Sequence, residues 1–172
     1  PATTTRVFSK AARGVIPCTR ATVFPTSDRP GQMSTTTEMI QGGCHCGALR
    51  YEVSGLPFDA DYCHCRDCQR TTGAPVAAWM DFKKEQVRWL AGEPAEYASS
   101  EYIRRGFCPR CGSSLSYRST QYPDYLTLSI ASLDEPDLVR PKYHIHTDSR
   151  VSWLNIDDEC PRYAAGRDNV AE

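Results

Sequence analysis

Seven of the nine cysteines stand in three short clusters whose spacing suits metal chelation. Cysteines one or two residues apart offer two thiolates to the same ion from one turn of backbone, whereas disulfide frameworks usually distribute their cysteines along the chain. The odd total also leaves any complete disulfide scheme with an orphan. We therefore expect reduced, metal-binding thiolates. The clusters are Cys44-His45-Cys46, Cys63-His64-Cys65-Arg66-Asp67-Cys68 and Cys108-Pro109-Arg110-Cys111-Gly112.

The seven thiolates divide naturally into four and three. The two separate pairs would clamp one ion in a closed structural site, because four protein ligands complete a tetrahedron. The middle trio lies within six residues, and three ligands would leave one position open for water or a substrate. The pairs are Cys44/Cys46 and Cys108/Cys111, and the trio is Cys63, Cys65 and Cys68.

Two alternatives remain open on these residues. In the first, both sites are structural and a histidine completes the second one; His45 and His64 are the spare ligands, although each lies between two cysteines and is expected to point away. In the second, the metal is iron, because tetrahedral thiolate sites fit either element. We favour zinc, since nothing in the sequence suggests electron transfer and the 108–112 run has the proline and glycine of a zinc knuckle.

The composition describes one globular domain: 172 residues, 40% apolar and 24% charged. A formal charge of −1 argues against binding to nucleic acid or to anionic lipid that is driven mainly by electrostatic attraction. No apolar stretch approaches the ~18 residues that a membrane-spanning helix needs, so no integral membrane segment is expected. The oligomeric state cannot be predicted from these features.

Residues 1–32 differ from the rest, with a net charge of +4 against −5 for residues 33–172. A basic, hydroxyl-rich and acid-poor segment is typical of an organelle transit peptide; the alternative is a disordered extension before an internal start at Met33. We divide the chain into an N-terminal extension (1–38), one zinc-binding domain (39–163) and a C-terminal tail (164–172). Reduced thiols favour an intracellular location, either cytoplasmic or, with a transit peptide, mitochondrial.

Short alternating runs predict a mostly β, antiparallel domain with short helical turns. Leu49, Tyr51 and Val53 fall on one face of the first run, and the run 125–130 alternates strictly. One helical turn is expected at 66–72. The expected strands are 48–53, 76–82, 86–90, 103–107, 114–117, 125–130, 144–146 and 151–156.

The three clusters with their flanking residues resemble the glutathione-dependent formaldehyde-activating enzyme family, which shares its domain with centromere protein V. The resemblance covers about residues 40–163 and includes all seven clustered cysteines in order. The segments that carry it are Gly42–Gly47, Tyr62–Arg70 and Phe107–Gly112, followed by Pro141–Ile145, Trp153 and Pro161–Tyr163.

The resemblance implies an Mss4-like β-fold with two Zn²⁺ ions per chain. It makes Cys44, Cys46, Cys108 and Cys111 the structural ligands. It makes Cys63, Cys65 and Cys68 the ligands of a catalytic zinc. The implied activity is that of a carbon–sulfur lyase, interconverting glutathione plus formaldehyde and S-hydroxymethylglutathione or a related thiol–aldehyde adduct. The alternative is a non-catalytic binding module in which both metal sites are structural.

Glutathione carries two carboxylates, which need cationic partners, and an arginine suits a carboxylate through paired hydrogen bonds. Five arginines flank the clusters, while His144 could transfer a proton and three aromatic residues could line a pocket. For each of these residues a structural role is the competing interpretation. They are Arg66, Arg70, Arg104, Arg105 and Arg110, with Tyr102, Tyr122 and Trp79.

Overall fold

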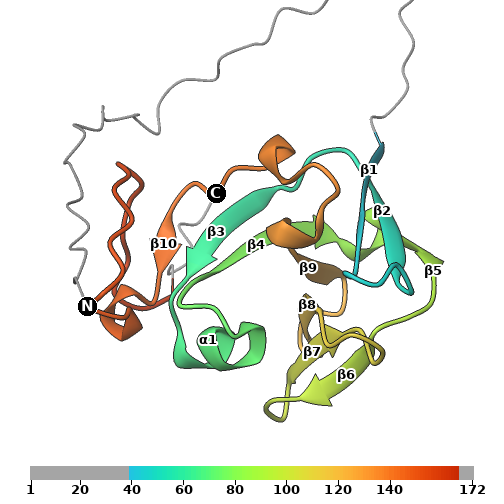
Figure 1. Cartoon of the computed structure of the whole chain (residues 1–172), viewed down its shortest axis with the longest axis horizontal. Helices are drawn as coiled ribbons and strands as arrows, with labels where there is room; N and C mark the ends of the chain where they lie inside the picture. The colour runs from blue at the N-terminus through green and yellow to red at the C-terminus, as the bar shows by residue number, and fades with distance from the viewer. Residues whose placement is uncertain (1–38, 167–172) are drawn as a thin grey trace, which may run out of the picture.

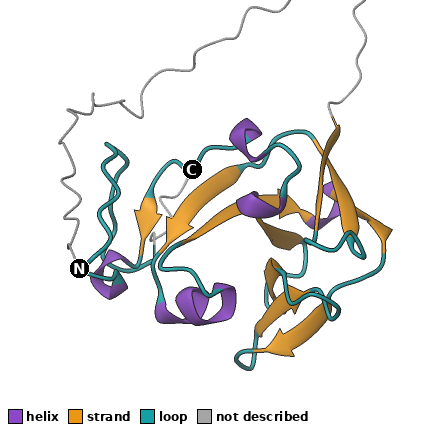
Figure 2. Cartoon of the chain, viewed as in Figure 1, coloured by secondary structure: helices purple, strands orange, loops and turns teal. Residues whose placement is uncertain are grey.

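The structure is a computed structural model that describes residues 39–166. The predicted transit peptide, the extension 1–38 and most of the tail 164–172 lie outside the described residues. Strands dominate, and helix is confined to one short α-helix and several 3-10 turns (Figure 2). The predicted mostly β class is therefore confirmed. No helix in the described part of the chain has the length and apolar character needed to cross a membrane.

The strands form two sheets. The smaller one is antiparallel, has the order β1-β2-β5 and lies at one end of the molecule, away from α1 (Figure 1). The larger one has the order β10-β3-β4-β9-β8-β7-β6 and is antiparallel except at the short β10–β3 pair. The strands are β1 (Met39–Gly43), β2 (Arg50–Ser54), β3 (Asp59–Cys63), β4 (Ala77–Lys83), β5 (Val87–Ala91), β6 (Ala95–Ala98), β7 (Ile103–Phe107), β8 (Ser114–Ser119), β9 (Tyr125–Ser129) and β10 (His144–Ile145).

The helical elements are short and follow strand ends. The α-helix occupies the residues expected for it and ends at Gly73, whose φ of 70° closes the last turn in the left-handed conformation. The elements are α1 (Arg66–Thr72), η1 (Lys84–Gln86), η2 (Ile130–Ser132), η3 (Pro136–Leu138) and η4 (Thr147–Ser149).

The main core lies between the two sheets and explains the alternating patterns. The side chains of Leu49, Tyr51 and Val53 are buried, as their alternation predicts, and so are those of Leu128 and Ile130. Most of these apolar groups belong to one continuous cluster. The position of each strand in the sheets is therefore set by which face it buries.

Some strand predictions were wrong. The segment 151–156 forms no strand, because it has no ladder partner. The sequence pattern also missed β1, β3 and β6. In β1 the adjacent glycines hide the strand signal, yet Gly42 is needed there: a Cβ at this position would lie 2.4 Å from the Tyr51 hydroxyl. In β3 two aspartates interrupt the apolar alternation.

Truncation of Leu128 tests the assignment of the core. Leu128 is fully buried between strands, so Leu128→Ala should lower the free energy of unfolding by about 2–5 kcal/mol in chemical denaturation. The matched control is Leu138→Ala, because Leu138 is 48% exposed and its loss should cost no more than about 0.5 kcal/mol. Equal effects of the two substitutions would contradict this core.

Candidate metal centres and the adjoining cavity

Four cysteine sulfurs meet where two hairpin turns face each other. One turn connects β1 to β2 and the other connects β7 to β8, so each sheet contributes one pair. All four Sγ atoms lie within 4.8 Å of one another. The Sγ atoms of Cys44 and Cys46 are 3.6 Å apart, and those of Cys46 and Cys108 are 3.9 Å apart. The two predicted pairs therefore come together as one group that could hold a metal ion.

Glycine and backbone N–H groups shape both turns. Gly47 and Gly112 follow the second cysteine of each pair and have φ values of 74° and 78°, which only glycine adopts without strain. The folded turn brings the Leu49 N–H to 3.2 Å from the Cys44 Sγ.

Hydrogen bonds from the side chain and backbone of Ser113 lower the pKa of Cys111 to about 5. Burial raises the pKa of Cys44, but hydrogen bonds from Leu49 and Cys108 outweigh it, so the pKa of Cys44 is also lowered. These contacts favour the thiolate, the form that metals bind, at Cys44 and Cys111, whereas a backbone hydrogen bond at Cys46 is outweighed by burial and the neighbouring thiols, which raise the pKa of Cys46 to about 11.

The other three sulfurs gather where β3 ends and α1 begins. Cys63 is the last residue of β3, and Cys65 is the N-cap of α1, accepting a hydrogen bond from the Cys68 N–H at 3.3 Å. These three Sγ atoms also lie within 4.8 Å of one another. Among the histidines, cysteines and acidic residues of 39–166, no fourth donor atom joins this group.

The three thiols share their hydrogen bonds unequally. Contacts with Cys63 and Cys68, with a smaller contribution from the charge of His146, lower the pKa of Cys65 to about 2. Contacts with Cys65 and Cys68, followed by burial, raise the pKa of Cys63. The group therefore carries its first thiolate at Cys65.

A cavity of about 420 Å³ opens beside the three-cysteine group. Its walls come from six strands, β3, β4, β7, β8, β9 and β10, from the start of α1 and from the residues that follow β6 and β10. The strand residues are buried or half-buried, so the cavity is a recess in the large sheet rather than a surface dip. The lining residues include Cys63, Cys65, Cys68, Asp61, Trp79, Arg105, Tyr117, Ile145 and His146.

Arg105 is the buried cation of this cavity. Its Nη1 lies 3.7 Å from the Cys68 Sγ, and its guanidinium stacks over the Tyr117 ring at 5.4 Å. Tyr117 is the cross-strand partner of Arg105 in the β7–β8 ladder, so the sheet register places the two side chains together. The guanidinium offsets the negative charge of the thiolates and leaves donors that could bind an anion.

Asp61 is the buried acid of the cavity. Its Oδ2 has no hydrogen-bond partner in the described structure, and its side chain is only 8% exposed. Burial, followed by the charges of Asp81 and Asp59, raises the pKa of Asp61 to about 8. The carboxyl group is therefore protonated far more readily than an ordinary aspartate.

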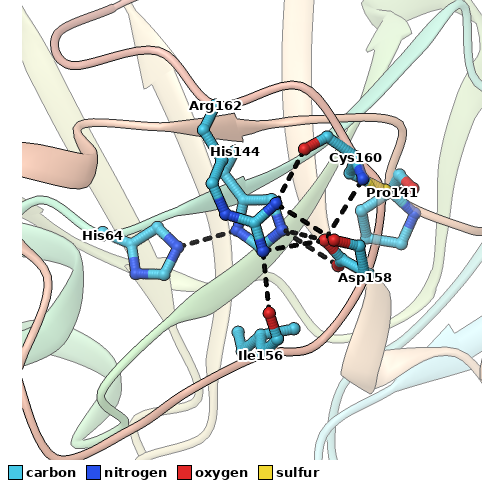
Figure 3. Close-up of polar contacts among 7 residues, drawn as sticks. All are labelled: His64, Pro141, His144, Ile156, Asp158, Cys160 and Arg162. Carbon is cyan, nitrogen blue, oxygen red and sulfur yellow. Dashed lines mark hydrogen bonds and ion pairs between the residues drawn. The ribbon is translucent and has the colours of Figure 1, made fainter. Parts of the chain in front are cut away.

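The side chain of His64, which lies between Cys63 and Cys65 in the sequence, enters a hydrogen-bonded chain with His144 and Asp158 (Figure 3). Asp158 accepts from the His144 Nε2 at 3.0 Å, and the His64 Nε2 lies 2.8 Å from the His144 Nδ1. A carboxylate only accepts, so a neutral His144 carries its proton on Nε2 and accepts from His64 through Nδ1. Burial, followed by the charge of His144, lowers the pKa of His64 and keeps it neutral.

The hydrogen-bonded chain of His64, His144 and Asp158 holds the backbone of residues 63–65 in place. The His64 N–H donates to the Ile145 carbonyl at 3.0 Å, and the His64 carbonyl accepts from Gln69 at 2.7 Å. The His64 ring stacks on the buried His144 ring with centroids 5.1 Å apart. Because His64 lies between two cysteines of the group, fixing His64 also fixes the positions of Cys63 and Cys65.

The predicted site residues fall into distinct places. Arg105 and Trp79 line the cavity, whereas Arg66, Arg70 and Arg110 are exposed at the surface. Arg104 donates to backbone carbonyls at 3.1–3.2 Å, including those of Ser100 and Glu101. His144 lines a different cavity on the other side of β3. Tyr122 lines a neighbouring groove rather than the cavity itself.

The sequence interpretation missed Asp61 and His146. Asp61 lies in a strand that the apolar pattern did not reveal. His146 was included only as the end of a strand, and nothing in the residue types marks its unusual backbone. A useful signal was the separation of Asp61 from Cys63, because residues two apart in a strand share a face.

Together, a two-sheet β-domain and two cysteine groups that could each hold a metal ion define this class of β-protein, with one of the groups at a cavity. The family model described as glutathione-dependent formaldehyde-activating enzyme matches residues 39–149. The chain therefore belongs to this family.

Individual relatives are more distant. A Halomonas elongata protein with the provisional name of a glutathione-dependent formaldehyde-activating enzyme is 28% identical over 69% of this chain and 82% of its own length. A Schizosaccharomyces pombe protein named an uncharacterised lyase is 29% identical over 46% of this chain and 58% of its own length. A crystal structure of a Rhodobacter sphaeroides protein matches with a TM-score of 0.49 and 26% identity, over 59% of this chain and 97% of that one.

The histidine chain gives a prediction about acid stability. Burial raises the pKa of Asp158, but the hydrogen bond and charge of His144 outweigh it, so the folded pKa is lowered. A lowered carboxyl pKa stabilises the fold above the unfolded pKa of about 3.9, and this contribution disappears as the pH falls through the folded pKa. Asp158→Asn should therefore lower the free energy of unfolding by about 1–3 kcal/mol at neutral pH.

The difference between wild type and Asp158→Asn should shrink as the pH falls below about 4, measured by urea denaturation at several pH values. The neighbouring exposed carboxylate supplies the control, and Asp157→Asn should change stability little at any pH. A deficit in Asp158→Asn that stays constant with pH would contradict the electrostatic origin of the effect.

Proposed function

We propose that the chain is a zinc-dependent carbon–sulfur lyase that interconverts S-hydroxymethylglutathione and glutathione plus formaldehyde, or acts on a related thiol–aldehyde adduct. The observation that carries the proposal is the meeting of three cysteine sulfurs at a cavity, where no fourth histidine, cysteine or acidic donor from residues 39–166 is grouped with them. Family membership supports the glutathione and formaldehyde part. The lyase name of the yeast relative supports the reaction class.

The sulfur geometry fits zinc. Zinc–sulfur bonds of about 2.3 Å in a tetrahedron place neighbouring sulfurs about 3.8 Å apart. The measured separations in the four-cysteine group are 3.6 and 3.9 Å. We assign Cys44, Cys46, Cys108 and Cys111 to a structural zinc, and the three-cysteine group to the catalytic zinc. A bound zinc would supply a site at which a sulfur is held as thiolate.

The cavity residues suit a glutathione adduct. Arg105 is buried beside the sulfurs and is the cation best placed to pair with a glutathione carboxylate. Trp79 and Ile145 provide apolar walls that keep bulk water from the reacting carbon. In cleavage, the carbon–sulfur bond breaks with its electron pair on sulfur, and the hydroxyl proton passes to an acceptor in the cavity.

The location of the protein follows from the same chemistry. Seven cysteines act as ligands in this proposal, and all must be reduced to bind metal. An intracellular reducing compartment remains our prediction for this reason.

Substitution of single ligands tests the two proposed sites separately. Cys65→Ser should abolish cleavage of S-hydroxymethylglutathione and reduce bound zinc from two ions per chain to one, while the fold remains intact, because only the cavity group loses a ligand. Metal analysis, circular dichroism and a formaldehyde-release assay measure these outcomes.

The matched variant is Cys111→Ser, which removes one exposed sulfur from the group that joins the sheets, whereas Cys65 is half-buried. It should lower the melting temperature more than Cys65→Ser does. A fully active Cys65→Ser protein would refute the proposed lyase. A fourth protein ligand on the second zinc would favour a binding module, and iron in place of zinc would favour an electron carrier.

A further inference from the structure

We propose that His146 is a catalytic proton-transfer residue of the cavity, taking the hydroxyl proton of the adduct in cleavage and returning it in synthesis. The inference rests on the proposed function and adds a residue to it. It starts from the backbone of His146, which has φ 55° and ψ 39°. Within residues 39–166, His146 is the one non-glycine residue with positive φ.

The unusual backbone decides which cavity His146 reaches. In β10, His144 and Ile145 pair with Tyr62 and Cys63 of β3, and successive side chains of a strand point to opposite faces. Ile145 lines the three-cysteine cavity and His144 lines the cavity on the other side. A regular continuation would turn His146 to the side of His144. Instead, His146 lines the same cavity as Ile145, next to Cys65.

The surrounding chain holds this conformation in place. The His146 N–H donates to the Ala165 carbonyl at 2.9 Å, and the His146 carbonyl accepts from the Ser149 N–H at 3.0 Å. A non-glycine residue in the left-handed conformation costs free energy, so it persists only where the surrounding structure holds it, and such positions cluster at functional sites. Here the result is an imidazole at the cavity wall.

The imidazole of His146 is available to a ligand. Its ring makes no hydrogen bond to any residue of the described structure, unlike the ring of His144. It is half-buried, and it lines the same cavity as Cys65. The ionisable groups that share its cavity are Asp61, Cys63, Cys65, Asp67, Cys68, Asp81, Arg105 and Tyr117.

His146 alone can accept and return the proton in both directions of the reaction. In cleavage, neutral His146 accepts the hydroxyl proton, the C–O bond becomes a carbonyl, and the C–S bond breaks with its electron pair on sulfur. The imidazolium then returns the proton to the glutathione thiolate as the product leaves. In synthesis, the imidazole accepts the thiol proton and delivers it to the carbonyl oxygen once the C–S bond has formed. No other reactant is needed.

The test variant must remove the imidazole but keep the backbone. His146→Asn does so, because asparagine tolerates the left-handed conformation better than other non-glycine residues. Two matched variants accompany it. Asp61→Asn removes the competing proton acceptor of the cavity, and His45→Asn removes an exposed imidazole beside the other cysteine group.

The first measurement is calorimetric binding of glutathione to the zinc-loaded proteins, in buffers of different ionisation enthalpy at about pH 7.5, where imidazole side chains are mostly neutral. Wild type and His45→Asn should release almost no proton, because the thiol proton passes to His146. His146→Asn should release about one proton per glutathione bound. Equal proton release by wild type and His146→Asn would overturn the inference, as would a change seen in Asp61→Asn alone.

The second measurement is turnover of S-hydroxymethylglutathione. His146→Asn should lower kcat about 10²- to 10⁴-fold with little change in KM, and added imidazole should restore part of the rate. Undiminished turnover by His146→Asn, with active wild type, would overturn this inference and leave the proposed lyase standing. A wild-type protein that neither binds glutathione nor cleaves the adduct would overturn both.

Discussion

The meeting of two hairpin turns from different sheets is the constraint on which the rest of the architecture depends. Cys44 and Cys46 belong to the small sheet, and Cys108 and Cys111 belong to the large one. Their sulfurs can approach only if the sheets are packed in one relative position. Beneath the turns, Leu49 and Leu115 form a small core with the buried cysteines. The contacts among the four cysteine sulfurs and the apolar packing beneath them therefore support the same arrangement of the two sheets.

The two cysteine groups differ in what surrounds them. The four-cysteine group lies in turns, with Cys46 and Cys111 exposed, and the cavity of about 370 Å³ beside it is lined by Cys44 but by none of the other three cysteines. The three-cysteine group lies against a cavity that contains a buried arginine and a buried aspartate. Behind it, the His64–His144–Asp158 chain immobilises the ligand segment. The first setting suits a ligand set that stays closed, and the second suits one that exchanges an outside molecule.

Much of this could be predicted from local sequence. Cysteine spacing separated a group of four cysteines from a group of three, as the structure has them, and alternation located most of the strands and their buried faces. The helix 66–72 was predicted at its observed residues with its end near Gly73, and in the structure Cys65 caps its start. Each of these features depends on neighbours within a few positions along the chain.

The rest depends on long-range pairing that a local pattern does not contain. Of five candidate arginines, Arg105 enters the cavity because the β7–β8 ladder places it opposite Tyr117. Asp61 becomes a cavity residue only when β3 is recognised as a strand. The orientation of His146 depends on its backbone dihedral and on hydrogen bonds from residues around 149 and 165. The segment 151–156 has a strand-like composition but no strand beside it.

The close packing of Gly106 against Ser116 restricts the register of the β7–β8 ladder. A Cβ on residue 106 would lie 2.0 Å from the Ser116 Oγ, so the hydroxyl would have to move to admit any larger residue at this step. Since side chains alternate along a strand, sliding β7 by one position would bring a bulky residue into that space and swing Arg105 to the outer surface. The smallest residue of the strand thereby keeps the one buried guanidinium of the cavity aimed inward.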